Sequence, residues 1–186
     1  MNLPNKLTLL RVILVPFFVF FLLTDIVPFS KIIALALFAA ASITDALDGH
    51  IARSRNLITT FGKFLDPLAD KVLVVSALIC MCELGIVGSV PLIIIVAREF
   101  MVSGLRLVTA NEGVVVAAGI WGKLKTAFTM VAIVVILVGL CFNFTGSMAE
   151  IANIVYQVLI WISTVLTVIS GGVYLKGYWK YIDASK

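Results

Sequence analysis

Six apolar stretches, each close to twenty residues long, dominate the sequence. They cover residues 7–26, 32–53, 63–84, 91–109, 122–143 and 150–175. A helix of about 20 residues spans the hydrocarbon core of a bilayer. Hydrophobic residues make up 62% of the chain and charged residues 13%, against about half and about a quarter in a soluble domain. We therefore predict an all-α, polytopic membrane protein with six transmembrane helices that form a single domain over residues 1–186.

The first apolar stretch follows Lys6 and Arg11 and has the outline of a signal peptide. The residues after it read TDIVPFS and contain no small-residue cleavage pattern. We therefore expect this stretch to be retained as the first span.

Basic residues gather on alternate connections between the spans. They lie at the start of the chain and in the even-numbered connections, and they follow the sixth span: Lys6, Arg11, Arg53, Arg55, Lys63, Arg106, Lys123, Lys125, Lys176, Lys180 and Lys186. The odd-numbered connections hold little positive charge. Because cytoplasmic loops carry the excess of lysine and arginine, we predict that both termini are cytoplasmic.

Four of the chain's ten acidic residues lie between residues 45 and 70. Asp45 and Asp48 are three residues apart, and Asp66 and Asp70 are four apart. Either spacing places both carboxylates of a pair on one helix face, about 40–60° apart. Clustered carboxylates in a membrane need a compensating charge, and ligation by oxygen alone suits Mg²⁺, Mn²⁺ or Ca²⁺ rather than zinc. The pattern predicts a divalent-cation site with room for two ions.

The four acids allow two other interpretations. The first is a set of buried ion pairs with Lys71, Arg53 or Arg98; it is disfavoured because the acids cluster while the bases lie mostly on other helices. The second is the midplane site of a cation transporter. The acids instead lie at span ends beside Arg53 and Lys63, and the sequence lacks the repeated broken helices of such transporters. The modest charge of +4 and the absence of a polybasic patch exclude nucleic acid as an expected partner.

Polar residues within the spans also gather at particular ends. Because successive helices alternate in direction, the polar ends of the first five spans lie on the cytoplasmic side. Charges inside a membrane are costly unless they face one another or a wet cavity. We therefore expect one polar cavity, open to the cytoplasm and lined by spans one to five. The sixth span is nearly uncharged, and we expect it, like Cys80, Cys82 and Cys141, to serve packing.

The stretch that holds the four acids reads D-x2-D-G-x2-A-R-x8-G-x3-D-x3-D. Its fixed positions are Asp45, Asp48, Gly49, Ala52, Arg53, Gly62, Asp66 and Asp70. At each of them it resembles the signature of the CDP-alcohol phosphotransferases, and the six spans agree with the architecture of that family. On spacing alone, Gly49 and Gly62 fit tight helix packing as well as the close approach of a phosphate.

The resemblance implies a reaction in which a CDP-linked donor loses CMP to an attacking alcohol. It implies that Asp45 and Asp66 are ligands shared by two metal ions, Mg²⁺ or Mn²⁺, that Asp48 binds one ion and that Asp70 binds the other. Asp70 is also the implied general base. The implied donor-binding residues are Asn5, Thr8, Gly49, Arg53, Thr59 and Gly62. The family further implies a homodimer.

Three more stretches bear on the acceptor: PNKLTLLR (4–11), AREFMVSGLR (97–106) and GKLKT (122–126). Together they are similar to the bacterial branch of the family that transfers the phosphatidyl group of CDP-diacylglycerol to sn-glycerol 3-phosphate, with the active site facing the cytoplasm at the cell membrane. Other acceptors within the family, namely phosphatidylglycerol, inositol phosphate or serine, are the alternatives.

The basic residues support a phosphorylated acceptor independently, because a dianion needs cationic hosts. The candidates are Arg98, Arg106, Lys123 and Lys125. Arg98 and Arg106 are eight apart and lie on broadly similar faces of a helix. Lys123 and Lys125 are two apart, so only one of them faces inward. We expect Glu99 to pair with a neighbouring arginine and hold it in place.

Overall fold

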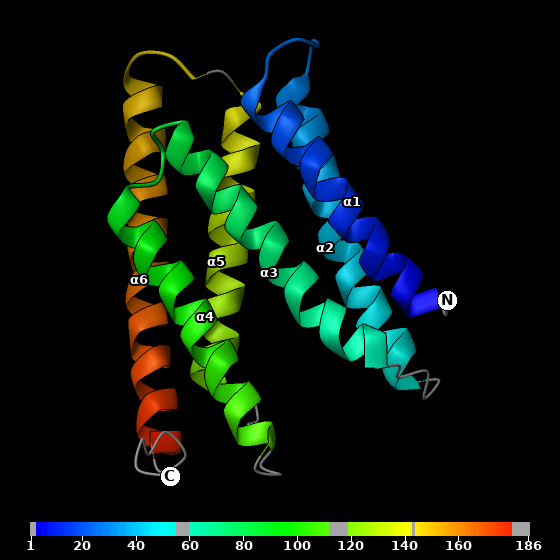
Figure 1. The fold of residues 1–186 in the computed structure, drawn as a ribbon. Coiled ribbons are helices and arrows are strands. Elements are labelled where there is room, and N and C mark those ends of the chain that lie inside the picture. The colour runs from blue at the N-terminus through cyan, green and yellow to red at the C-terminus, as the bar shows by residue number, and fades with distance from the viewer. Residues whose placement is uncertain (1–2, 55–59, 112–118, 143, 180–186) are drawn as a thin grey trace. The chain divides into compact units, whose positions relative to one another are not determined.

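The computed structural model describes the backbone of residues 3–54, 60–111, 119–142 and 144–179, with the side chains at 3–5, 45–54, 60–68, 70 and 110–111 left out. Six helices and no strand occur in this part of the chain (Figure 1). They are α1 (Leu3–Leu23), α2 (Ser30–Ser54), α3 (Thr60–Glu83), α4 (Ser89–Asn111), α5 (Ile120–Leu140) and α6 (Ser147–Tyr178). The predicted all-α class is confirmed, with one helix for each predicted span.

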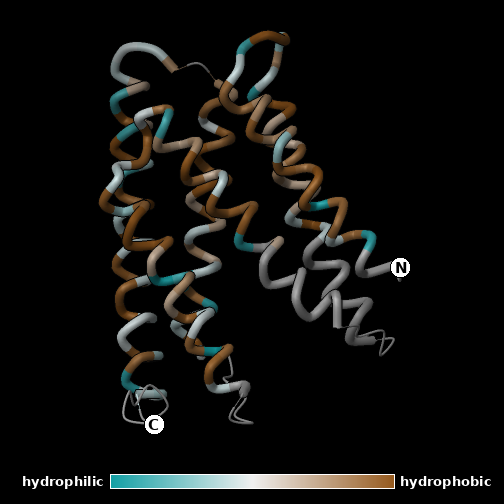
Figure 2. The backbone as a smooth tube through the Cα atoms, in the orientation of Figure 1, coloured by the Kyte–Doolittle hydropathy of each residue, from teal (hydrophilic) through white to brown (hydrophobic). Residues whose placement is uncertain are grey.

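Three of the described helices are long and apolar enough to cross a membrane. They comprise Lys6–Leu23 within α1, all of α5 and all of α6. Hydrophobic residues predominate along α1 and α5 (Figure 2), and large apolar side chains such as Phe17 and Val165 are exposed. So many large apolar side chains on the surface indicate that this surface contacts lipid. The chain is therefore a multi-pass membrane protein, and the crossing of the bilayer by α2, α3 and α4 stays a prediction.

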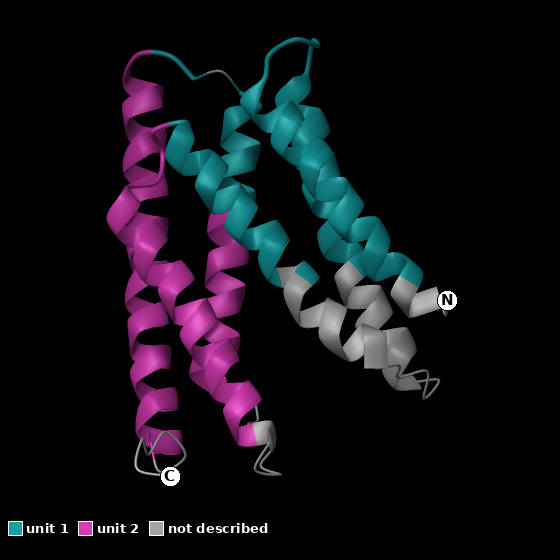
Figure 3. Cartoon of the chain, in the orientation of Figure 1, with its two compact units in different colours: residues 1–84, 134–145 teal, residues 85–133, 146–186 magenta. Residues whose placement is uncertain are grey.

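The helices pack into two compact units (Figure 3). Unit 1 comprises residues 1–84 and 134–145, and unit 2 comprises residues 85–133 and 146–186. Within unit 1, α1 packs along both α2 and α3; within unit 2, α4 packs along α6.

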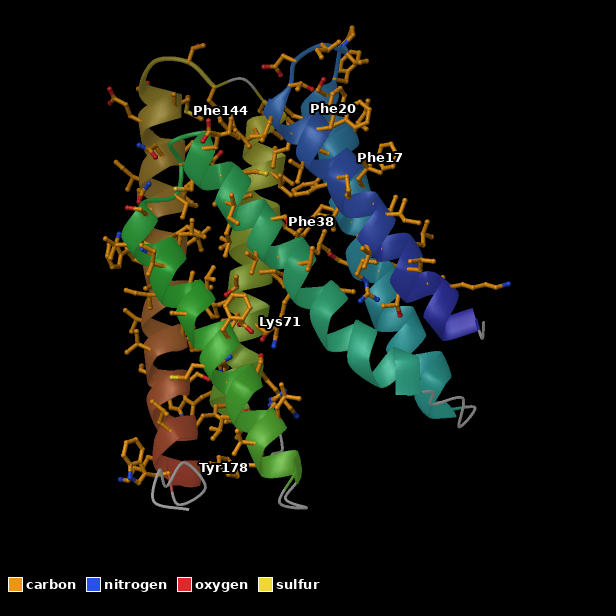
Figure 4. The ribbon with its side chains drawn as sticks, viewed as in Figure 1. Phe17, Phe20, Phe38, Lys71, Phe144 and Tyr178 are labelled. Carbon is orange, nitrogen blue, oxygen red and sulfur yellow. The ribbon has the colours of Figure 1, made fainter. Side chains whose placement is uncertain are left out.

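The core of unit 1 follows a spacing of three and four residues along its helices. The buried positions of α1 are Thr8, Arg11, Val15, Phe18 and Leu22, and those of α2 before residue 45 are Ser30, Ala34, Phe38 and Ala41. This spacing keeps one stripe of each helix facing its neighbour. The rings of Phe18 and Phe38 meet at 5.6 Å between centroids, whereas Phe17 points away from the core (Figure 4).

Lys31 fixes the turn between α1 and α2. Its ammonium group donates a hydrogen bond of 2.7 Å to the carbonyl of Leu22, at the end of α1, and lies 3.0 Å from the carboxylate of Asp25. A cation at a helix C-terminus satisfies carbonyl groups that have no partner within the helix. Phe29 completes the reversal with a positive φ of 67°.

The core of unit 2 contains Val102, Leu105 and Tyr174, with Met101 and Tyr178 packed against it. Gly171 allows α4 and α6 to approach closely, because a Cβ atom at this position would lie 3.2 Å from Cγ of Arg98 and 3.3 Å from Cε of Met101. The hydroxyl groups of Thr129 and Ser163, 2.6 Å apart, join α5 to α6.

Candidate functional site

The four aspartates of the signature lie in helices, as predicted. Asp45 and Asp48 fall in the last turns of α2, and Asp66 and Asp70 in the first turns of α3. The end of α2 and the beginnings of α1 and α3 lie at the same end of unit 1 (Figure 1). The aspartate side chains are outside the described residues, as are the donor-site predictions Asn5, Gly49, Arg53, Thr59 and Gly62.

The helical register relates each aspartate to the described core. Asp45 lies seven residues after Phe38, Asp48 seven after Ala41, Asp66 seven before Leu73 and Asp70 seven before Ala77. Seven residues are about 20° short of two full turns of an α-helix. Each of these four reference residues is no more than 3% exposed. The register therefore predicts that all four aspartates lie on the helix faces that pack inside unit 1.

α1 is polar at the corresponding end. Thr8 and Arg11 are fully buried, and they lie seven residues before Val15 and Phe18 on the packed stripe. A buried guanidinium group in a membrane helix needs polar surroundings. The packed stripe of α1 therefore changes from apolar to polar towards the beginning of the helix. This is the same end of unit 1 at which α2 ends and α3 begins (Figure 1), and those two segments contain the four aspartates.

Among the described side chains, no three Asp, Glu, His or Cys residues come together as they would around a metal ion. The three cysteines are free, and Cys80 is buried while Cys82 and Cys141 are half-buried, as expected of packing residues. The four aspartates, whose side chains lie outside the described residues, stay the predicted cation ligands.

Glu99 is the centre of a second polar cluster, in unit 2. The ammonium group of Lys125 on α5 donates a hydrogen bond to Oε1 of Glu99, and Nη1 of Arg98 lies 3.7 Å from the same oxygen. The side chains of Lys125 and Glu99 are only 3% and 16% exposed. The predicted pairing of Glu99 with an arginine is present, but its nearest partner is the lysine.

The structure separates the two candidate lysines. Lys125 is buried against Glu99, whereas Lys123 is exposed. They stand 200° apart around α5 because successive residues of a helix rotate by about 100°. Lys125 is therefore the lysine that shares a cluster with Arg98.

Both arginines of α4 contact α6. Nη2 of Arg98 donates a hydrogen bond of 2.6 Å to the hydroxyl of Ser170, and Nη2 of Arg106 donates one of 3.3 Å to the hydroxyl of Tyr174. Their guanidinium carbons lie 5.4 and 5.7 Å from the centroid of the Tyr174 ring. The sixth span, expected to serve packing, also supplies polar partners to two candidate site residues.

The cluster has an excess of positive charge. Arg98, Arg106 and Lys125 bring three cations, and Glu99 brings one carboxylate. Arginine presents paired N–H donors that match the oxygens of a phosphate. The arrangement suits the binding of a small phosphorylated molecule.

A sequence model of the CDP-alcohol phosphatidyltransferase family matches residues 1–169. The chain belongs to this family. Three curated relatives carry the name CDP-diacylglycerol–glycerol-3-phosphate 3-phosphatidyltransferase. The protein of Bacillus subtilis is 39% identical and covers 99% of this chain and 98% of its own length. The protein of Rickettsia bellii is 39% identical, with 97% of each chain covered. The protein of Haemophilus influenzae is 41% identical, with 94% of this chain and 92% of its own length covered.

Several contacts of this CDP-alcohol phosphatidyltransferase were not foreseen from the sequence. They involve Ser170 and Tyr174, which contact the arginines of α4; the burial of Arg11 was not foreseen either. The sequence does contain a pattern that indicates the contacts of α6, because polar residues at 163, 167, 170 and 174 recur every three or four positions in an otherwise apolar helix. Such a stripe marks one polar face on a membrane helix.

Proposed function

We propose that this CDP-alcohol phosphatidyltransferase transfers the phosphatidyl group of CDP-diacylglycerol to sn-glycerol 3-phosphate, giving phosphatidylglycerophosphate and CMP. The observation that carries the proposal is the set of relatives named for this reaction, which align with the chain almost end to end. The family match spans residues 1–169 and thus both packing units, which supports one catalytic domain.

The donor site of the proposal is the aspartate signature. Asp45, Asp48, Asp66 and Asp70 offer carboxylate oxygens alone, a donor set that fits Mg²⁺ or Mn²⁺. We assign Asp45 and Asp66 to both of two ions, Asp48 to one and Asp70 to the other. Bound divalent ions would supply positive charge beside the diphosphate oxygens. The register that relates all four residues to the packed core supports this assignment.

The chain's own residues then perform the transfer. The carboxylate of Asp70 takes the proton from the free primary hydroxyl of glycerol 3-phosphate. The hydroxyl oxygen forms a bond to the phosphorus that carries the diacylglycerol, and the bond from this phosphorus to the bridging oxygen breaks. CMP departs with the electron pair. Arg53 pairs with its phosphate, and Gly49 and Gly62 let the nucleotide approach the helices, with Asn5, Thr8 and Thr59 at the same donor site.

The acceptor site of the proposal is the cationic cluster of unit 2. Arg98, Arg106 and Lys125 bind the phosphate of glycerol 3-phosphate, and Lys123 contributes long-range attraction from its exposed position. Serine lacks a phosphate and would leave these charges unmatched, so it fits less well. Inositol phosphate and phosphatidylglycerol are the remaining alternatives within the family. Family membership favours a transferase over a cation transporter.

The proposal includes the setting of the enzyme. The basic connections support cytoplasmic termini and an active site that faces the cytoplasm at the cell membrane. We also propose a homodimer; its mass in detergent, measured by light scattering, tests this part separately.

One assay tests the reaction. Purified protein is given CDP-diacylglycerol with glycerol 3-phosphate, serine, inositol phosphate or phosphatidylglycerol in parallel, and CMP release is measured. We expect CMP only with glycerol 3-phosphate. Release with a different acceptor would replace the proposed substrate, and no release with any acceptor would reject the proposed reaction.

A further inference from the structure

Tyr174 of α6 lies close to both arginines of α4. Its side chain is buried, and both guanidinium carbons lie within 5.7 Å of its ring centroid. The face of an aromatic ring attracts a cation electrostatically, more strongly where water is excluded. One ring thus holds two like charges that would otherwise repel each other.

The hydroxyl group of Tyr174 is fixed as well. It accepts hydrogen bonds from Nη2 of Arg106, at 3.3 Å, and from the backbone N–H of Gly119, at 3.1 Å. A Cβ atom at Gly122 would lie 3.2 Å from the hydroxyl oxygen and 3.4 Å from Cε2 of the ring. The first turn of α5 therefore fits around this hydroxyl, and a side chain at Gly122 would displace it.

Ser170, one turn earlier on α6, orients the deeper arginine. It accepts the hydrogen bond from Nη2 of Arg98, while Nε of Arg98 is buried without a hydrogen-bond partner among the described residues. α6 thus sets the directions of both arginines, from two residues spaced four apart. Tyr178, a further turn along (Figure 4), stacks on Tyr174 with ring centroids 6.4 Å apart.

We infer that Tyr174 is a positioning residue that holds Arg98 and Arg106 at a fixed separation for the phosphate of the acceptor. The inference rests on the proposed function, because it assigns the arginines to a phosphorylated acceptor. Tyr174 acts through the arginines and takes no part in the transfer itself. Its loss therefore weakens binding of the acceptor in ground state and transition state alike, which raises the KM for the acceptor and leaves kcat unchanged.

Steady-state kinetics of Tyr174→Leu test the inference, with the KM values for glycerol 3-phosphate and CDP-diacylglycerol measured separately. We expect the acceptor KM to rise about tenfold, since two cation–π contacts and a hydrogen bond are lost, while the donor KM changes by less than about twofold. Tyr174→Phe keeps the ring and should raise the acceptor KM about threefold. Tyr174→Trp restores a ring face and should recover most of the loss of the leucine variant.

Tyr156→Leu is the matched control. Tyr156 is also buried on α6, about 27 Å along the helix from Tyr174, and among the described residues it makes no hydrogen bond or cation–π contact with an arginine. We expect both KM values of this variant to match the wild type. Gly122→Ala approaches the hydroxyl from α5 without changing Tyr174 and should raise the acceptor KM about threefold. If Tyr174→Leu does not fold, the acceptor KM values of Gly122→Ala and Tyr174→Phe test the inference instead.

The outcomes separate the inference from the reaction on which it rests. Wild-type enzyme that does not use glycerol 3-phosphate overturns both. Wild-type enzyme that uses it, with Tyr174 variants that change neither KM or change both equally, overturns the positioning role and leaves the reaction standing. A loss of kcat at unchanged KM values also overturns the positioning role.

Discussion

The ammonium group of Lys125, on α5, donates a hydrogen bond to Oε1 of Glu99, on α4, and both side chains are largely withdrawn from solvent. A third charge lies nearby, because Nη1 of Arg98 is 3.7 Å from the same oxygen. Among the described residues, Glu99 is thus the carboxylate that lies close to both Lys125 and Arg98. Removal of Glu99 and removal of Lys125 should therefore have unequal effects.

We predict that Glu99→Gln destabilises the protein more than Lys125→Met. The glutamine variant leaves two cations close together without a counter-charge, and breaking a buried pair in this way costs about 3–5 kcal/mol. The methionine variant leaves Glu99 with Arg98 and should cost about 1–2 kcal/mol. Thermal unfolding of the single and double variants in detergent measures the difference. Equal losses, or strictly additive losses in the double variant, would contradict the pairing.

A second prediction concerns the aspartates of the signature. Replacement of Asp45, Asp48, Asp66 or Asp70 by asparagine should abolish CMP release, because a neutral amide neither holds a divalent ion as a carboxylate does nor takes a proton from the acceptor. Membrane insertion should be unaffected. Asp25→Asn is the matched control, since Asp25 pairs with Lys31 and its side chain is 81% exposed. A signature variant with near-wild-type turnover would remove that residue from the mechanism.

Chelation should silence the enzyme. EDTA is expected to stop CMP release, and Mg²⁺ or Mn²⁺ added in excess is expected to restore it, because four clustered carboxylates need a compensating charge. Ca²⁺ serves as the comparison. It is larger than Mg²⁺ and its coordination is more flexible, so we expect it to restore less CMP release than Mg²⁺ does. Activity that survives exhaustive chelation would refute the metal assignment.

Arg106→Ala should raise the KM for glycerol 3-phosphate about tenfold, with little change in the KM for CDP-diacylglycerol. The estimate follows from a charge-assisted hydrogen bond of about 1.5–3 kcal/mol, reduced because Arg106 is exposed. Lys176→Ala removes an exposed cation from α6 and controls for a general loss of positive charge. The assignment fails where the alanine variant of Arg106 changes both KM values equally.

The packing of unit 1 yields a stability prediction. Phe18→Ala should lower the free energy of unfolding by about 2 kcal/mol, since its ring is fully buried against Phe38. The value lies below that of a water-soluble core because lipid replaces water as the alternative environment. Phe17 is the next residue along α1 and is 54% exposed, so Phe17→Ala should change the free energy of unfolding little. Similar losses for both variants would mean that the stripe of α1 is assigned to the wrong face.

The helices could be predicted from hydropathy because length and apolarity alone define a span. The expected 122–143 and the observed Ile120–Leu140 differ by a few residues at each end. The sixth span, expected at 150–175, runs through Gly171 and Gly172, and the observed helix extends from Ser147 to Tyr178. Gly171 is there because α4 passes close to it, a reason that concerns another helix and leaves no mark in the local sequence.

Some residues of the candidate site could likewise be predicted from the sequence, and others could not. Fixed spacing was enough to propose the aspartates, because two short spacings on helices determine shared faces. The choice between Lys123 and Lys125, and the role of Tyr174, depend instead on how α5 and α6 are rotated. Where the face towards lipid is as apolar as the packed face, hydropathy leaves the rotation of a membrane helix open. On α6 the polar residues at 163, 167, 170 and 174 mark the packed face, but they do not identify the neighbour that it contacts.

The hydroxyl groups along α6 bear on how the chain enters the bilayer. Thr164 donates to the carbonyl of Ile160 and Thr167 to that of Ser163, each one turn back on the same helix. Such bonds satisfy polar groups before any neighbouring helix arrives. α6 is therefore competent for insertion on its own, and Ser170 and Tyr174 become engaged only when α4 docks. The hydrogen bonds that orient Arg98 and Arg106 therefore form only once α4 and α6 have packed together, and not during the insertion of either helix alone.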